Sequence, residues 1–330
     1  MALLLLTGMP DLKAQHIELL EQGKPTSIRG LSVVDDKVAW VSGSKGYVAI
    51  TTNGGKTWDW QQVKGFEKAD FRDIEAFSDK EAIIMSSGTP ALIVKTIDGG
   101  ANWQVKYKNA DTAYFLDAMD FADKKHGFVL GDPIKGKFVL LETKNGGENW
   151  LSFENPPSAL PGEAAFAASG TCLRVNKRFL SIVTGGSHSR ELVWVKDGWL
   201  QSNLIFSNKK PSQGAFSVAS NGEINIYVGG DYANDKRTDS TSEYWHFDGS
   251  YGGGPILLSK TPPSGYQSCV ENIKGDTFLS TGTPGSNITT DGGRNWSKID
   301  NTSYNVCRKA KSGTLVLLAG DRGKIGILKL

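Results

Sequence analysis

The stretch TNGGKTW at residues 52–58 decides the fold, because its pattern returns along the chain. Further copies are IDGGANW at residues 97–103, KNGGENW at 144–150 and TDGGRNW at 290–296. Their tryptophans are 45, 47 and 146 residues apart, and the last gap equals three intervals of about 49 residues. We predict two eroded copies inside that gap, at residues 196–199 and 248–249. A period of this length is typical of β-propeller blades.

Each copy is predicted to be a turn between two strands, followed by an aromatic anchor. An aspartate or asparagine side chain accepts nearby backbone N–H groups, and two glycines adopt the positive φ angles that the turn needs. The tryptophan then packs between neighbouring sheets and buries a large apolar area. We therefore assign a structural role, not a catalytic one, to Asn53, Trp58, Asp98, Trp103, Asn145, Trp150, Asp291 and Trp296.

Three short β-type runs precede each turn and one follows it, which predicts antiparallel blades of four strands. Six blades are predicted near residues 27–63, 71–108, 114–154, 163–204, 213–259 and 266–300. The C-terminal residues supply three more strands, and the segment 16–21 is predicted to add the fourth. Joining both ends of the chain in one blade removes a free sheet edge. The sequence thus predicts an all-β, seven-bladed propeller in a single domain over residues 15–330.

The composition of the chain limits the classes of partner and cofactor that we expect. The 330 residues carry a formal net charge of +2, so the overall charge does not favour nucleic acid or an anionic membrane surface. No segment is long and apolar enough to be a membrane span, and no cofactor motif is present. Cys172, Cys269 and Cys307 lack metal-ligand spacing; Cys269 and Cys307 occupy matching places in neighbouring repeats, and we expect buried free thiols. A monomer without metal or cofactor is expected.

The apolar start of the chain is similar to part of a secretory signal. Residues 1–9 are mostly apolar and residues 12–14 suit a cleavage site, although the basic region that opens a signal peptide is missing. We therefore predict export to the periplasm or the exterior, with residues 1–14 as a signal remnant. An ordinary N-terminus on a cytoplasmic protein is the alternative.

The turns resemble the Asp-box, or BNR, repeats of sialidase-like propellers. From about residue 25 to 330 the chain is more similar to bacterial relatives of the photosystem II stability and assembly factor family. The segments that carry this resemblance are VLGDP at 129–133, GEAAFAASG at 162–170, VTGG at 183–186 and GGDY at 229–232. The resemblance implies a propeller and a scaffold for other proteins. Such relatives are often labelled oxidoreductases, but no redox cofactor motif supports that activity here.

Polar and charged residues gather in the loops expected on the face away from the Asp boxes. In a propeller, the connections into each first strand and between second and third strands meet there, around the axis. Candidate acids and bases are Asp132, Glu163, His188 and Asp231. Candidate ligand-binding residues are Arg29, Lys45, Arg72, Arg190, Tyr232, Gln267 and Arg322, with Asp321 beside the last. Both signs of charge recur at equivalent places, which favours a polar ligand pocket over ordinary solvated loops.

Two classes of function remain open. One is a binding or assembly scaffold whose axial pocket takes a protein or carbohydrate ligand. The other is a glycoside hydrolase or lyase for acidic sugars, in which Arg29 and Arg72 hold a substrate carboxylate and paired carboxylates act as acid and base. The Arg-Ile-Pro motif of sialidases is absent and no nucleophile can be assigned. Whether the chain is an enzyme is therefore left open by the sequence.

Overall fold

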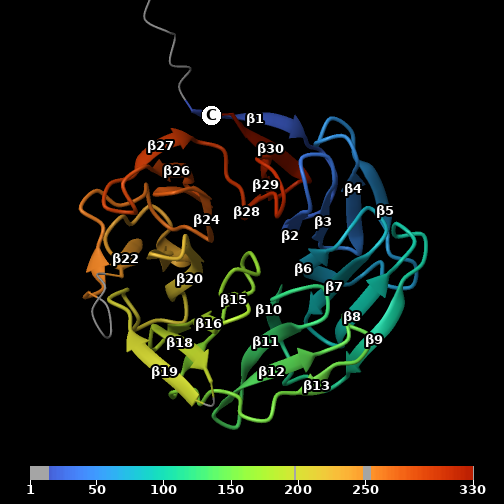
Figure 1. Cartoon of the computed structure of the whole chain (residues 1–330), viewed down its shortest axis with the longest axis horizontal. Helices are drawn as coiled ribbons and strands as arrows, with labels where there is room; N and C mark the ends of the chain where they lie inside the picture. The colour runs from blue at the N-terminus through green and yellow to red at the C-terminus, as the bar shows by residue number, and fades with distance from the viewer. Residues whose placement is uncertain (1–14, 197, 248–253, 330) are drawn as a thin grey trace, which may run out of the picture.

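Seven antiparallel sheets surround a central axis like the blades of a propeller (Figure 1). The computed structural model describes residues 15–196, 198–247 and 254–329. The predicted signal remnant, residues 1–14, and the predicted eroded turn at 248–249 lie outside the described residues. Among the residues that are described, none forms a helix long and apolar enough to cross a membrane. The predicted all-β, seven-bladed fold is confirmed.

Each blade has four strands, which follow one another from the axis outward. Blade 1 contains β2 (Ile28–Val33), β3 (Ala39–Gly43), β4 (Tyr47–Thr51) and β5 (Asp59–Gln62). Blade 2 contains β6 (Asp70–Ala76), β7 (Ala82–Ser87), β8 (Ala91–Thr96) and β9 (Gln104–Asn109). Blade 3 contains β10 (Leu116–Phe121), β11 (Gly127–Ile134), β12 (Lys137–Thr143) and β13 (Leu151–Ser152). Blade 4 contains β15 (Leu173–Val175), β16 (Leu180–Val183), β18 (Arg190–Val195) and β19 (Gly198–Asn203).

The remaining blades follow the same plan. Blade 5 contains β20 (Gln213–Ser220), β21 (Ile224–Asp231), β22 (Ser242–His246) and β23 (Leu257–Leu258), with the short 3-10 helix η1 (Tyr232–Asn234) after β21. Blade 6 contains β24 (Cys269–Lys274), β25 (Thr277–Gly282), β26 (Gly285–Thr289) and β27 (Ser297–Asp300). Blade 7 contains β28 (Val306–Lys309), β29 (Val316–Gly320), β30 (Lys324–Lys329) and, from the other end of the chain, β1 (His16–Glu21).

The Asp-box turns are held by the contacts that their composition predicts. In the second box, Thr96 Oγ1 donates to Asp98 Oδ1 (2.8 Å) and accepts from the Gly100 N–H (2.9 Å). The Asn102 N–H donates to the same Asp98 oxygen (2.9 Å). Gly99 and Gly100 have φ angles of 77° and 88°, a region that favours glycine. The same three contacts recur in the boxes of blades 1, 3 and 6.

The box tryptophans join neighbouring blades. Trp103 of blade 2 packs edge-on against Trp40 of blade 1, with ring centroids 6.3 Å apart. Trp150 of blade 3 lies in one apolar cluster with Ile83 of blade 2, and Trp296 of blade 6 lies in another with residues of blade 5. A buried aromatic side chain contributes several kcal/mol to stability, so each box links a turn to a blade interface.

The N-terminal strand closes the ring, as the sequence predicts. β1 runs antiparallel to β30, with Ile17 opposite Leu328 and His16 opposite Lys329. The Ile17 side chain is buried, and Leu20 packs against the same apolar cluster. Blade 7 therefore has no exposed edge on the outer side of β30.

Blade 4 departs from the predicted boundaries. The first strand was expected to begin at Glu163, but β15 begins at Leu173. Glu163 and Ala164 form β14, which pairs with β17 (Gly185–Gly186), and β17 bridges to β20 of blade 5. The residues between β14 and β15 leave the sheets and run towards the axis, where Figure 1 shows them as the yellow-green segment ahead of β15.

Candidate functional site

A segment of blade 4, which we call the plug (residues 165–171), occupies the axis of the ring. Arg29 of blade 1 donates to the Ala168 carbonyl (3.2 Å) and Arg72 of blade 2 to the Ala167 carbonyl (3.4 Å). Ser169 Oγ donates to the Ser268 carbonyl ahead of blade 6 (2.7 Å). Contacts from several blades thus converge on one short segment, which fills the centre of the ring.

Close packing fixes the two ends of the plug. The Phe166 ring stacks on Phe216 of blade 5, with centroids 3.7 Å apart and planes 6° from parallel. Gly170 has a φ of 70°, and a Cβ at this position would collide with the Asp73 carboxylate. Only glycine fits there without displacing that buried group.

A cavity of about 590 Å³ opens on the axis at the Asp-box face. It is lined by the final residues of the inner strands and by the loops that lead into the second strands. Those loops share a face with the box turns, because the Gly99 and Gly146 N–H groups donate to the Lys80 and Lys125 carbonyls within them. The cavity therefore lies at the opposite end of the axis from the predicted pocket.

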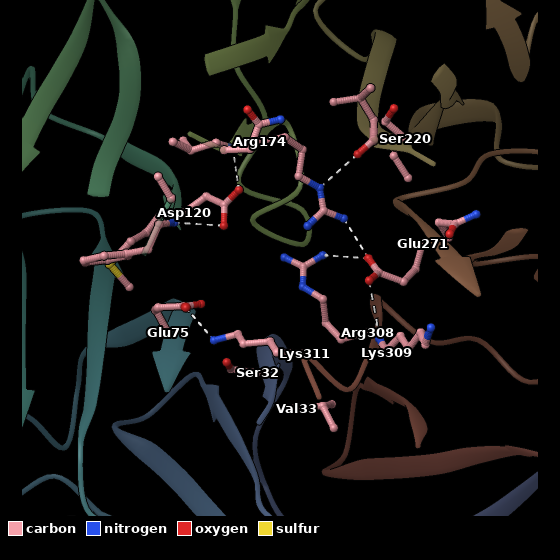
Figure 2. A pocket seen from close by; sticks show the side chains of 18 of the residues that line it. Ser32, Val33, Glu75, Asp120, Arg174, Ser220, Glu271, Arg308, Lys309 and Lys311 are labelled. Atoms are coloured by element: carbon pink, nitrogen blue, oxygen red, sulfur yellow. Dashed lines mark hydrogen bonds and ion pairs between the residues drawn. The ribbon is translucent and has the colours of Figure 1, made fainter. Parts of the chain in front are cut away.

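Opposed charges line this cavity (Figure 2). Arg174 Nη2 contacts Glu271 Oε2 at 2.8 Å, and Arg308 Nη1 lies 3.9 Å from the same oxygen. On the other wall, Lys311 Nζ pairs with Glu75 and donates to the Ala76 carbonyl (2.8 Å). Although burial opposes it, the negative charges of Glu271 and Asp120 hold the pKa of Arg174 above its usual value. The cavity thus presents fixed charges of both signs at its floor and walls.

Side chains at matching places on the inner strands also tie the blades together. Ser32 Oγ accepts the Ala76 N–H (3.0 Å), and Asp120 Oδ2 accepts the Val175 N–H (2.6 Å). Burial raises the pKa of Asp120 to about 6, with Arg174 opposing the shift. Each of these bonds joins one blade to the next, so the cavity wall is also a set of blade interfaces.

Asp73 makes the same kind of interblade contact beside the plug. Its carboxylate accepts the Met119 N–H of blade 3 (2.7 Å) and the Ile74 N–H (2.8 Å). Burial nevertheless raises the pKa of Asp73 to about 7, while Arg308 and these two bonds oppose the shift. The native state therefore keeps this proton at pH values where the unfolded chain has lost it.

We expect the wild-type protein to lose stability as the pH rises from 5 to 8, relative to Asp73→Asn. Because the folded pKa lies above the unfolded value, the contribution is fully present below about pH 4 and is lost as the pH rises through about 7. Between pH 5 and pH 8, the free energy of unfolding of the wild type should fall by roughly 2–3 kcal/mol more than that of Asp73→Asn. Urea unfolding at both pH values measures it, and Asp59→Asn on an exposed outer strand is the control. Parallel pH profiles of wild type and Asp73→Asn would contradict this assignment.

The residues predicted as a site lie on the other face, which we call the hairpin face. The structure brings Arg29 and Arg72 together on adjacent inner strands, both bound to plug carbonyls. Asp132 Oδ1 accepts the Ala165 N–H (3.3 Å), and burial raises its pKa. A hollow of about 620 Å³ lies beside Asp132 and is lined by residues 159–164.

Two of the predicted acid or base residues have structural roles. Glu163 is buried and accepts two bonds from the Arg190 guanidinium, at 2.6 and 2.9 Å, so these two candidates neutralise each other. Asp231 accepts the Ala233 N–H at the start of η1 (3.0 Å), and although burial opposes it, hydrogen bonds hold its pKa below the usual value. His188 is exposed, and its Nδ1 lies 2.8 Å from Ser187 Oγ.

The other predicted ligand-binding residues lie either in hairpin turns or in packed positions. Lys45 and Arg322 are exposed and occupy positive-φ positions in the hairpins of blades 1 and 7. Gln267 is fully buried and donates to the Tyr266 carbonyl (3.0 Å). Tyr232 is 53% exposed and packs edge-on against Phe216 and Tyr266. Arg29, Arg72 and Tyr232 thus remain predicted ligand-binding residues, while Glu163 and Arg190 have a clear structural role.

Most charged residues of the cavity lie on strands, whereas the sequence prediction placed the site on loops. The signal that marks them is a charge beside apolar residues near the end of an inner strand, as for Glu75 in IEA (74–76), Arg174 in LRV (173–175) and Arg308 in VCRK (306–309). A charged side chain in an inner strand of a propeller points to the axis or to a blade interface, since apolar residues fill the other positions. Within the described ranges, no three His, Cys, Asp or Glu side chains gather to hold a metal ion.

Comparison with known proteins finds a family match over part of the chain and similar folds over most of it. Residues 12–110 match the family model described as photosynthesis system II assembly factor YCF48. The solved structure "YCF48 bound to D1 peptide" is 15% identical, with a TM-score of 0.68 over 98% of each chain. "YCF48 from Cyanidioschyzon merolae" is 14% identical, with a TM-score of 0.66 over 94% of this chain and 98% of that one. Virginiamycin B lyase from Staphylococcus aureus is 12% identical, with a TM-score of 0.67 over 96% and 100%. No curated protein matches significantly.

Proposed function

We propose that this BNR-type propeller, which is related to the photosystem II assembly factor, is a protein-binding assembly scaffold. A fold of the same kind holds a peptide in the structure of YCF48 bound to D1 peptide. In this chain we place the partner segment at the cavity on the Asp-box face. The observation that carries the proposal is a cavity of about 590 Å³ with charged side chains on its walls.

The chemistry of the cavity suits a polypeptide segment. The walls carry the ion pairs Arg174–Glu271 and Lys311–Glu75. A segment with both signs of charge can add its own charges to these pairs. Apolar wall residues such as Val33 and Phe121 offer contact for an apolar side chain. Rigid blades hold these groups in place, which reduces the entropy lost on binding.

The carbohydrate-active alternative gains less support from the contacts. A glycosidase mechanism needs one carboxyl group to act as acid and a second to act as base or nucleophile. Glu163 is neutralised by Arg190, and Asp231 accepts backbone and side-chain bonds at the start of η1. These groups are occupied with structural tasks, whereas a binding scaffold requires no free acid and base. We therefore favour the scaffold.

We expect Ser220→Trp to weaken partner binding at least about tenfold, or roughly 1.4 kcal/mol. Ser220 is an exposed cavity-lining residue at the end of β20, so the indole occupies part of the cavity without disturbing the core. The probe is a displayed library of short random peptides, selected on the wild-type protein and measured by titration calorimetry. Ser202→Trp, on the exposed outer strand β19, is the matched control and should bind like wild type.

Two results would count against this function. If the library yields no peptide that binds the folded protein, a peptide-binding scaffold is not supported. If selected peptides bind Ser220→Trp and wild type equally, the cavity is not their site. Thermal melting of each variant confirms that the fold is retained.

A further inference from the structure

Two free thiols face each other beneath the cavity. Cys269 lies on β24 of blade 6 and Cys307 on β28 of blade 7, and both are buried. Their sulfur atoms are 3.7 Å apart, within van der Waals contact of each other. The sequence predicts buried free thiols here, and both are free and buried in the structure. Two sulfurs at this separation need only a small movement to form a covalent bond.

The Cys269 sulfur is surrounded by hydrogen-bond donors. It lies 3.4 Å from the Cys307 backbone N, 3.8 Å from Thr171 Oγ1 of the plug and 3.9 Å from Arg308 Nη1. Burial alone raises the pKa of Cys269, but the Cys307 thiol and the Arg308 charge outweigh it and lower the pKa. When Cys269 is protonated, its S–H donates to the Cys307 carbonyl (3.3 Å); when it is ionised, its sulfur accepts from the donors named above. The site therefore stabilises the thiolate, which is the nucleophilic form.

The other two thiols differ from Cys269 in their surroundings. The Cys307 thiol donates to Cys269 or to the Leu279 carbonyl (3.7 Å), and burial raises its pKa. Cys172 is equally buried, and burial together with the nearby Asp117 carboxylate raises its pKa. The chain thus contains a nucleophilic thiol, a partner thiol in contact with it, and a third buried thiol that serves as an internal control.

We propose that Cys269 and Cys307 form a redox pair that a small peroxide oxidises to a disulfide. The Cys269 thiolate attacks one oxygen of hydrogen peroxide, the O–O bond breaks, and hydroxide leaves and takes up a proton to become water. The resulting sulfenic acid is attacked by Cys307 sulfur, the S–O bond breaks, and a second water forms with the proton of Cys307. Two electrons pass from the dithiol to the peroxide.

The position of the pair decides which oxidants reach it. Arg308 lines the cavity and its Nη1 lies 3.9 Å from the Cys269 sulfur, so its guanidinium links the cavity to the thiolate. Hydrogen peroxide is close to water in size, whereas an aromatic disulfide reagent is too large for a fully buried sulfur. The same guanidinium donates to the Ser169 carbonyl of the plug (3.4 Å) and lies 3.9 Å from Glu271. Loss of the thiolate charge therefore removes one of the anchors of Arg308.

The test uses the folded full-length protein at pH 7 with a limited amount of hydrogen peroxide. The reaction is stopped with catalase, and the unfolded chain is alkylated and analysed by mass spectrometry. We expect a product that is lighter by two hydrogens, with a peptide containing Cys269 linked to one containing Cys307. Both should resist alkylation until dithiothreitol restores them. Cys269 should react at least about tenfold faster than Cys172.

Variants identify the order of the steps. Cys307→Ser should leave a sulfenic acid on Cys269 that dimedone traps when the chain is unfolded in its presence, while Cys172→Ser should form the disulfide at the wild-type rate. The proposal is overturned if native Cys269 is oxidised no faster than Cys172, or if no linkage between Cys269 and Cys307 forms. The comparison of Cys269 with Cys172 is made within the wild-type chain, so it holds even where a variant folds poorly.

Discussion

Arg190→Ala is expected to destabilise the protein by about 3–5 kcal/mol, the cost of leaving a buried charge without its partner. The Arg190 and Glu163 side chains are 7% and 0% exposed, and two parallel N–H to oxygen bonds join them. Glu163 also accepts the Leu160 N–H (2.8 Å) and the Thr184 hydroxyl (2.6 Å). These bonds attach β14 to blade 4. Arg190→Ala removes some of them, so the plug loses its attachment at one end. Urea unfolding monitored by tryptophan fluorescence measures the loss.

The double variant Glu163→Gln/Arg190→Met is the informative control. Both charges are then absent, so no carboxylate is left buried alone, and it should recover at least half of the loss seen in Arg190→Ala. Arg322→Ala, in an exposed hairpin of the same face, should change stability by less than about 0.5 kcal/mol. A loss for Arg190→Ala no greater than that of Arg322→Ala would refute the structural role of the pair.

Deletion of residues 1–24 should lower the stability of the ring by about 3–6 kcal/mol. The deletion removes β1, which buries Ile17, packs Leu20 on the core and pairs with β30 along its length. Each apolar side chain contributes about 1.5–3 kcal/mol, and the lost backbone pairs add to this. The β30 edge also becomes free to pair with other chains, so we expect aggregation on heating. Melting temperature and light scattering are the measurements.

Point substitutions separate the strand from the rest of the deleted segment. Ile17→Asp should reproduce much of the loss, because it places a charge on the buried face of β1. Leu19→Ser is the matched control, since the Leu19 side chain is 45% exposed and should be replaced with little effect. A truncated protein that melts like wild type would show that β1 does not close the ring.

The sequence predicts the parts of the fold whose causes are local. A complete Asp-box turn forms within seven residues, through contacts among Thr96, Asp98, Gly100 and Asn102. The box can therefore be recognised without knowing what surrounds it. The spacing of the boxes then gives the number of blades, and the leftover strands at the two ends give the closure by β1. These predictions needed only a repeat and the rule that a sheet edge must be covered.

The plug and the cavity could not be predicted in this way. The plug residues 165–171 are small apart from Phe166, and nothing in them signals that they leave the sheet. Their course is decided by Arg29, Arg72 and Ser268, which are remote in the sequence. Glu163 was a candidate acid or base because its partner, Arg190, lies 27 residues further along the chain. Charged residues on loops are easily assigned to a site when the partner that neutralises them is not visible.

The plug also has a consequence for the order of folding. Its hydrogen bonds to Arg72, Ser268 and Arg29 join residues 95, 99 and 139 positions apart, whereas the box turns join residues no more than four apart. Long chain loops must close before such bonds can form, so they belong to the late, slow steps of folding. Individual blades can form during synthesis, but the centre of the ring can be completed only after Ser268 has been synthesised. Until then the apolar inner strands already synthesised face an open channel, and this is the interval in which the nascent chain most needs protection from aggregation.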